Sequence, residues 1–211
     1  MLSQPRPLFD SSLAALVLAN THNGGAQPRT ARISNRVSRL RGGSTTALPI
    51  QFSPEPDPTT NVIDLGQEQS TGPLPLGFEF EFFGVRYTLF DLSSEKDARA
   101  PLVSWLLRFP RSRFLPLNPN ADLDSFIALG WSDGCPPSRS QVAYEVRGAG
   151  QRRRLVLSFT LVPPFDSEPG TMTAQLVLHE RTGMIDVHTR RQDTVAYKVK
   201  EEAVRFTTSL R

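Results

Sequence analysis

Phe78-Glu79-Phe80-Glu81-Phe82 is a stretch in which aromatic and acidic residues strictly alternate. Successive side chains of a β-strand point to opposite faces, so this order places the phenylalanines on one face and the carboxylates on the other. A helix would scatter the same phenylalanines around its circumference. The stretch therefore predicts a half-buried strand with its aromatic face toward a core.

The sequence on the C-terminal side continues in short runs of the same kind. Gly84 interrupts the pattern, and Val85, Tyr87 and Leu89 resume it in phase. Further apolar runs separated by turn residues lie at 126–131, 142–147, 155–162, 172–180, 184–189, 194–199 and 204–208. Short strands at such spacing are typical of sandwiches and barrels. We therefore predict an all-β domain over residues 61–211, built as an antiparallel, jelly-roll-like β-sandwich.

Two turns predict which strands are neighbours. The sequence Gly148-Ala149-Gly150 indicates that the strands before and after it pair as a hairpin. At Thr182-Gly183, pairing Arg181 with Met184 keeps one face of the hairpin apolar, because a one-residue slip would reverse the two faces. That pairing assigns Leu176, Leu178, Ile185 and Val187 to the core, and His179, Asp186 and His188 to a solvated face.

Residues 93–124 are the least regular part of the predicted domain. Ser94 and Asp97 resemble a helix capping box ahead of the apolar residues 105–107. Pro101 argues against a helix here, because proline removes a backbone donor. We treat the segment as an insertion with room for one short helix.

The N-terminal segment differs from the rest in charge and composition. Residues 1–50 hold six arginines, no lysine and a single acid, so they carry +5, and the rest of the chain carries −2. The predicted domain thus has no bulk charge that would argue for nucleic acid. Pro54, Pro56 and Pro58 follow in an extended acidic linker, since each proline biases its predecessor away from helix. We assign residues 1–60 to a basic, flexible leader and linker, with order beginning after it.

Four interpretations of this leader stay open. The apolar residues 13–19 fit the core of a secretory signal peptide, with Val17 and Ala19 before the cleavage point. The Arg-rich, acid-poor composition also fits an organelle transit peptide. A retained segment would instead be a phosphate-binding arm or a disordered tail without a partner. The arginines of such an arm are Arg29, Arg32, Arg36, Arg39 and Arg41.

The strongest catalytic motif is a G-x-S-x-G sequence at residues 130–134. The triad that it suggests consists of Ser132, Asp166 or Asp186, and His188. A nucleophile elbow requires a helix after its turn, but Cys135 and two prolines follow here. The sequence also lacks the βαβ pattern of a parallel sheet, so we expect no hydrolase.

Other reactive side chains favour structural interpretations. His179, Glu180 and His188 lack the spacing of a metal motif, and the predicted register separates Glu180 from both histidines. The basic run 152–154 lies at a hairpin tip, where a solvated turn is favoured. Cys135 is the only cysteine, which excludes an internal disulfide and a cysteine zinc cluster. We expect no catalytic residue, no cofactor and no metal ligand.

The order of these signals resembles the nidogen-type domain and related β-sandwich modules of extracellular and bacterial surface proteins. Those families open with Gly-Phe-x-Phe-x-Phe-Phe-Gly-x-x-Tyr, which residues 77–87 match closely. An Ile-Ala-x-x-Trp-x-Asp strand end corresponds to residues 127–133. A tyrosine-bearing strand, an Arg-led apolar strand and a Gln-x-x-Leu-x-Glu hairpin correspond to Tyr144, residues 154–159 and residues 175–180.

The resemblance covers about residues 74–188 and departs from the family at residues 93–96, which replace a Ser-Asn-Gly turn. It implies a non-enzymatic structural or adhesive module, secreted or at a cell surface, whose partner is a protein or a glycan. The alternative is a particle or capsid-like protein, virion-like or organelle-targeted, whose arginine arm binds nucleic acid. No apolar run approaches the roughly 20 residues that span a bilayer, so neither interpretation includes a membrane span.

Overall fold

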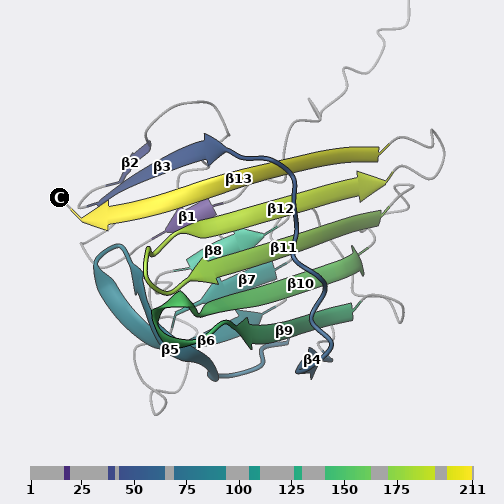
Figure 1. The fold of residues 1–211 in the computed structure, drawn as a ribbon, viewed down its shortest axis with the longest axis horizontal. Helices are drawn as coiled ribbons and strands as arrows, with labels where there is room; N and C mark the ends of the chain where they lie inside the picture. The colour runs from purple at the N-terminus through teal and green to yellow at the C-terminus, as the bar shows by residue number, and fades with distance from the viewer. Residues whose placement is uncertain are drawn as a thin grey trace, which may run out of the picture.

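The strands form two antiparallel sheets (Figure 1). The computed structural model describes residues 17–19, 38–40, 43–64, 69–93, 105–109, 126–129, 141–162, 171–192 and 199–210. The five-stranded sheet contains, in spatial order, β1 (Val17–Ala19), β8 (Phe126–Leu129), β7 (Trp105–Arg108), β6 (Val85–Ser93) and β5 (Leu74–Phe82). The eight-stranded sheet contains β2 (Ser38–Leu40), β3 (Gly43–Pro49), β13 (Val199–Leu210), β12 (Ile185–Gln192), β11 (Thr171–His179), β10 (Arg154–Val162), β9 (Gln141–Arg147) and β4 (Val62–Ile63). The predicted all-β, antiparallel sandwich is confirmed.

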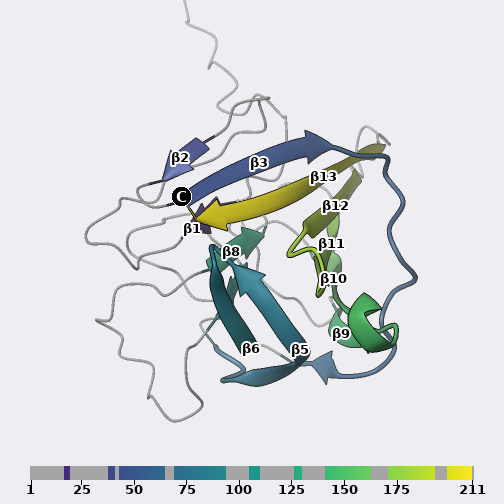
Figure 2. The same cartoon turned by 60° about the vertical axis from the view of Figure 1, so that its left-hand side comes forward.

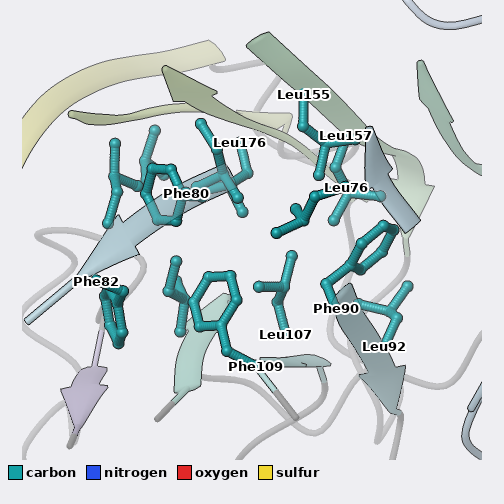
Figure 3. Close-up of a cluster of buried hydrophobic side chains, with 14 of the residues drawn as sticks. Leu76, Phe80, Phe82, Phe90, Leu92, Leu107, Phe109, Leu155, Leu157 and Leu176 are labelled. Atoms are coloured by element: carbon teal, nitrogen blue, oxygen red, sulfur yellow. The ribbon is translucent and has the colours of Figure 1, made fainter. Parts of the chain in front are cut away.

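The core lies between these two sheets, which Figure 2 shows as separate layers. Fully buried apolar side chains from both layers meet there (Figure 3). The five-stranded sheet contributes Phe80 and Phe82, and the eight-stranded sheet contributes Leu155, Leu157 and Leu176. Removing this apolar surface from water is the main favourable term in folding the domain.

β5 has the alternating burial that its sequence predicts. Phe78, Phe80 and Phe82 are buried, whereas Glu79 and Glu81 are exposed. The rings of Phe80 and Phe82 lie 5.7 and 4.9 Å from the ring of Phe109, which follows β7. The aromatic stripe is therefore confirmed as the inner face of the five-stranded sheet.

The β5–β6 ladder contains an irregularity that requires a glycine. Its register shifts between Pro75 and Phe80, and Gly77 lies in this interval with φ of +79°. A Cβ atom there would lie 3.0 Å from a methyl group of Val146 on β9. Glycine alone adopts this backbone conformation at little cost, so the Gly77 of the sequence motif has a geometric cause.

Trp105–Arg108, in the insertion where the sequence left room for one short helix, is the strand β7. β7 lies between β6 and β8 and pairs with both. Leu107 and Phe109 are both fully buried, and their two-residue spacing is the period of a strand. The described residues contain no α-helix, and their one helical turn is the 3₁₀ turn Gly150–Arg152 between β9 and β10. Ser94, Asp97 and Pro101 lie outside the described residues.

The β9–β10 hairpin is confirmed, and the faces of the β11–β12 hairpin are too. The predicted pairing of Arg181 with Met184 is wrong by two residues, because Leu178 lies opposite Ile185. The turn is longer than expected and is closed by the backbone N–H of His179, which donates to the carbonyl of Met184 at 3.0 Å. A two-residue shift leaves every side chain on its predicted face, so burial could not reveal it.

The eight-stranded sheet begins well before residue 61, where the sequence suggested that order starts. β3 pairs along the C-terminal half of β13, with Gly43 opposite Leu210. Residues 50–61, which we call the strap, then run from β3 across the sheet to β4 (Figure 1). Figure 2 shows the strap on the side of the sheet that faces away from β5 and β6.

Candidate functional site

The polar face of the eight-stranded sheet is buried beneath the strap. Asp186 and His188 of this face were expected to be solvated, but they are among four polar side chains of the face that are almost inaccessible to water. The four are Ser158, Gln175, Asp186 and His188, which are 2%, 3%, 5% and 6% exposed. This correction follows from the strap, because it supplies the second layer that a polar face would otherwise lack.

Gln175 on β11 holds the strap through the backbone of Glu55. The backbone N–H of Glu55 donates to Gln175 Oε1 at 2.7 Å, and Gln175 Nε2 donates to the Glu55 carbonyl at 2.9 Å. Gln175 Nε2 also donates to Ser158 Oγ on β10 at 3.0 Å. The side-chain amide thus meets both backbone groups of one residue, as a neighbouring strand would do.

The sequence of the strap explains why its backbone needs few hydrogen-bond partners. Pro54 and Pro56 carry no backbone N–H, so the residue between them supplies the only donor of that triplet. A proline-rich segment cannot form a regular ladder, but it leaves few donors that need partners when it lies over a sheet. The strap can therefore cross the strands and be held by side chains.

The carboxylate of Glu55 is the second anchor of the strap. Arg154 Nη2 donates to Glu55 Oε2 at 2.9 Å, and Arg154 Nε donates to Oε1. Arg147 Nη1 donates to Oε2 at 3.2 Å and to the carbonyl of Pro56 at 2.8 Å. Burial alone would raise the pKa of Glu55, but the two arginines outweigh it and hold the pKa below its usual value.

The basic run at residues 152–154 is only partly the solvated turn that we expected. Arg152 is exposed, but Arg154 binds Glu55 as described above. Arg153 donates to Glu180 Oε1 and Oε2 at 2.6 and 2.9 Å and to the carbonyl of Gly77 at 2.7 Å. The run therefore links the strap and the edge strand β5 to the β9–β10 turn.

Asp186 on β12 is the centre of the polar face. Arg205 on β13 donates to its carboxylate with two nitrogens, Nε to Oδ1 at 2.6 Å and Nη2 to Oδ2 at 2.7 Å. His179 Nε2 lies 2.9 Å from Asp186 Oδ2. Burial raises the pKa of Asp186, but the hydrogen bonds from Arg205 and His179 lower it far more, so the group stays ionised.

His188 lies two residues further along the same face of β12. The ring of Phe52, in the strap, meets it edge to face with 5.8 Å between centroids. The guanidinium of Arg190 lies over the Phe52 ring, 5.4 Å from its centroid. The Nδ1 atom of His188 is buried and has no hydrogen-bond partner among the described residues. Burial, reinforced by the charge of Arg205, lowers the pKa of His188 despite Asp186 and Glu55.

This arrangement fastens one segment of the chain onto a sheet. The carboxylates of Glu55 and Asp186 are each saturated by arginine donors, which favours their charged form and leaves them poor proton acceptors. Ser132, Asp166 and Cys135 lie outside the described residues. In the part of the chain that is described, no three His, Cys, Asp or Glu side chains are grouped so that they could hold a metal ion.

The structure places one of the five arginines of the proposed arm. Arg39 lies in the edge strand β2, opposite Ser44 of β3. The other four, Arg29, Arg32, Arg36 and Arg41, lie outside the described residues. No helix that could cross a bilayer occurs in the described ranges.

Two structurally important acids were missed by the sequence analysis. Glu55 had no distinguishing signal except its place between two prolines. Asp91 is fully buried in β6, where its Oδ1 accepts hydrogen bonds from Ser70 Oγ at 2.7 Å and Thr71 Oγ1 at 3.1 Å. Its neighbours Phe90 and Leu92 face the core, so the alternation of the strand gave no signal for the burial of Asp91.

The comparison with known proteins supports the resemblance inferred from the aromatic strand pair. The family model described as NIDO related matches residues 44–206, from β3 through the strap to β13. No curated protein and no solved structure matches the chain. The matched segment is most of the chain and contains every residue of the strap network, and on this basis the chain belongs to the NIDO-related family.

Proposed function

We propose that this protein is a non-enzymatic structural and adhesive module of a secreted or cell-surface protein, and that it binds a protein or glycan partner there. The observation that supports this most directly is the family match over residues 44–206. The use of the buried charges is consistent with it, because Glu55 and Asp186 each bind arginines that hold the fold together. Such buried ion pairs would help to keep a module folded outside a cell.

The two ends of the segment that matches the family lie on neighbouring strands. The match runs from β3 to β13, which are antiparallel neighbours, with Gly43 opposite Leu210. The strands between them can therefore project from this pair of strands, although β1 and β2 precede it in the chain and also belong to the sheets. A projecting β-sandwich offers its loops and exposed faces to a partner, as loops positioned by a rigid scaffold commonly do.

The N-terminus of the mature protein from its native source tests the location. Secretion predicts cleavage close to Ala19, which would remove β1 from the five-stranded sheet. Cleavage close to Gly42 would instead indicate a transit peptide, and an intact N-terminus would favour the retained arm. Adhesion is tested by binding of the purified mature protein to arrays of matrix proteins and glycans, where a flat response would contradict it.

The absence of hydrolase activity is tested at Ser132. We expect no labelling of the folded protein by a serine-directed phosphonate. Labelling that disappears in Ser132→Ala would overturn the non-enzymatic proposal, because it would show an activated hydroxyl.

The second candidate function is a particle-forming protein whose arm binds nucleic acid, and the charge of +5 on residues 1–50 favours it. This candidate predicts that the full chain binds DNA or RNA with a steep dependence on salt. The matched control is a chain that begins at residue 43, because β3 belongs to the sheet and must be kept. Equal binding by both chains, or no binding, would reject this candidate.

A further inference from the structure

His188 lies at the contact between the strap and the sheet. Its imidazole is 6% exposed and meets the Phe52 ring edge to face. Phe52 precedes Glu55 in the strap, so the ring contact and the Gln175 contact hold neighbouring parts of one extended segment. Any change at His188 that expels the Phe52 ring therefore acts on the strap as a whole.

Charged groups approach His188 from β12, β13 and the strap. On β12 it is flanked by Asp186 and Arg190, and on β13 by Arg205 beside its register partner Ala203. On β11 its register partner is the uncharged Gln175, while His179 is bound to Asp186. The strap contributes the carboxylate of Glu55. Both acids near His188 already bind arginines, so neither is free to pair with an imidazolium.

Because Nδ1 of His188 is buried without a hydrogen-bond partner, the closed strap favours the neutral imidazole. In a neutral imidazole, Nδ1 can be a bare acceptor, and an acceptor without a partner is tolerated in a buried site better than a donor. Protonation would turn Nδ1 into a buried N–H donor without a partner and would add a charge beneath the Phe52 ring. An open strap would expose both the donor and the charge to water.

We propose that His188 is a pH-sensitive lock on the strap: the neutral imidazole keeps Phe52 and the strap on the sheet, and protonation in mild acid releases them. Release uncovers Gln175 together with Arg147 and Arg154, which the strap otherwise engages through Glu55. The sheet itself stays folded, because its ladders and its apolar inner face do not depend on the strap.

The stability of the closed strap depends on pH through the lowered pKa of His188. Burial in the closed form lowers the pKa of His188 below its ordinary value of 6.5, so the open form binds the proton more tightly. The closed strap therefore keeps its full stability above about pH 6.5 and loses stability as pH falls toward the lowered pKa. Glu55 and Asp186 are separate from this transition, because their pKa values are lowered from 4.5 and 3.8 and they remain ionised throughout it.

Amide hydrogen exchange of the full chain at pH 7.5 and pH 5.0, corrected for intrinsic exchange rates, tests the lock. The reporters are the backbone amides of Ile50 and Glu55, which donate to Ala203 O and Gln175 Oε1. We expect their protection to fall at least tenfold at pH 5.0, while amides of β11 and β12 stay protected. Equal protection of the strap at both pH values would overturn the proposal, as would simultaneous loss in β11 and β12, which would report unfolding of the sheet.

Two variants separate His188 from other titrating groups. His188→Gln keeps a polar side chain without titration, so its strap should stay protected at pH 5.0. His179→Gln is the matched control, because His179 contacts Asp186 and not Phe52, and it should keep the wild-type response. A pH response that persists in His188→Gln, or disappears in His179→Gln, contradicts the lock.

Titration of the wild-type histidines by NMR tests the proposal even if His188→Gln does not fold. The chain contains three histidines, so the His188 resonance can be followed individually. Its titration midpoint should coincide with the midpoint of the loss of strap protection. Midpoints that differ by more than about one pH unit would assign the opening to another group and overturn the proposal.

Discussion

The two faces of the eight-stranded sheet are buried by different means. The inner face packs leucines such as Leu157 and Leu176 against the aromatic stripe of β5. The outer face carries Gln175 and Asp186, which are buried by the strap and by arginine side chains. Apolar packing is non-directional and adjusts to small changes, whereas a buried polar group requires its particular partners. The comparison shows that the polar residues of an alternating strand can be buried, as Gln175 and Asp186 are.

The inner face should give the largest effect on stability. Phe80→Ala removes a fully buried ring that packs against Phe109, and we expect a loss of about 3–5 kcal/mol of unfolding free energy. Glu79→Ala is the matched control on the opposite face of the same strand. Glu79 pairs with Arg86 in solvent, so the control should change stability by no more than about 0.5 kcal/mol.

Denaturant melts of both variants check this prediction. Equal sensitivity of the two positions would mean that the outward face of β5 is also covered, and it would contradict the assignment of the aromatic stripe as the sole buried face of that strand.

The outer face should give the next largest effect, through Gln175. Gln175→Leu leaves the Glu55 N–H and carbonyl and the Ser158 hydroxyl without their partner. Because buried polar groups without partners are costly, we expect a loss of about 2–3 kcal/mol although the variant is more apolar. Gln141→Ala, at an exposed position of β9, is the control and should stay within about 0.5 kcal/mol. A neutral Gln175→Leu variant would show that water replaces the lost contacts and that the outer face is wet.

The sequence alone could predict which residues of a strand share a face. Alternation in β5 and in the β11–β12 hairpin identified the inner faces because burial of apolar residues imposes a period of two. The same argument cannot detect a two-residue slip, which is why the β11–β12 register was wrong while its faces were right. The aromatic and glycine pattern of residues 77–87 was enough to indicate the family.

The strap network could not be predicted from local patterns. Gln175 and Glu55 are 120 positions apart, and three prolines made the segment around Glu55 look like a linker. β7 was missed for a similar reason, because four residues are too few to show a strand period and only their pairing with β6 and β8 defines them. In both cases the deciding contacts join distant parts of the chain.

The third prediction concerns the charge at the centre of the outer face. Asp186→Asn replaces one accepting oxygen with an NH₂ group, so one hydrogen bond from Arg205 is lost and the other loses the negative charge of its acceptor. We expect a loss of about 1–2 kcal/mol of unfolding free energy at pH 7. The pKa of Asp186 is lower in the folded state, so its contribution is fully present above the unfolded value of 3.8 and is lost as pH falls below it. Acid titrations of unfolding free energy should therefore be less steep below pH 3.8 in the variant. Parallel curves would show that Asp186 is not held ionised by the fold.

The smallest effect should come from the rim of the strap. Arg190 lies over the Phe52 ring and pairs with Glu201, but its side chain is 52% exposed. Contacts of this kind are screened by solvent, so Arg190→Ala should cost about 0.5 kcal/mol. Arg86→Ala, at a similarly exposed pair on β6, is the control and should give less, because no ring lies beneath it. Thermal melts resolve the difference, and a larger loss in Arg86→Ala would contradict the role of the Phe52 contact.

The ladder between β3 and β13 also has a consequence for synthesis of the chain. It joins residues 43–49 to residues 204–210, so the first long strand to leave a ribosome pairs with the last. Pairings between such distant segments form slowly, because closing a long loop comes before any gain from contact. We expect nascent chains stalled before residue 199 to leave β3 open to protease, and protection to appear once β13 has left the ribosome. The eight-stranded sheet would then be completed only when β13 becomes available, and β3 would stay an unpaired strand edge until that moment.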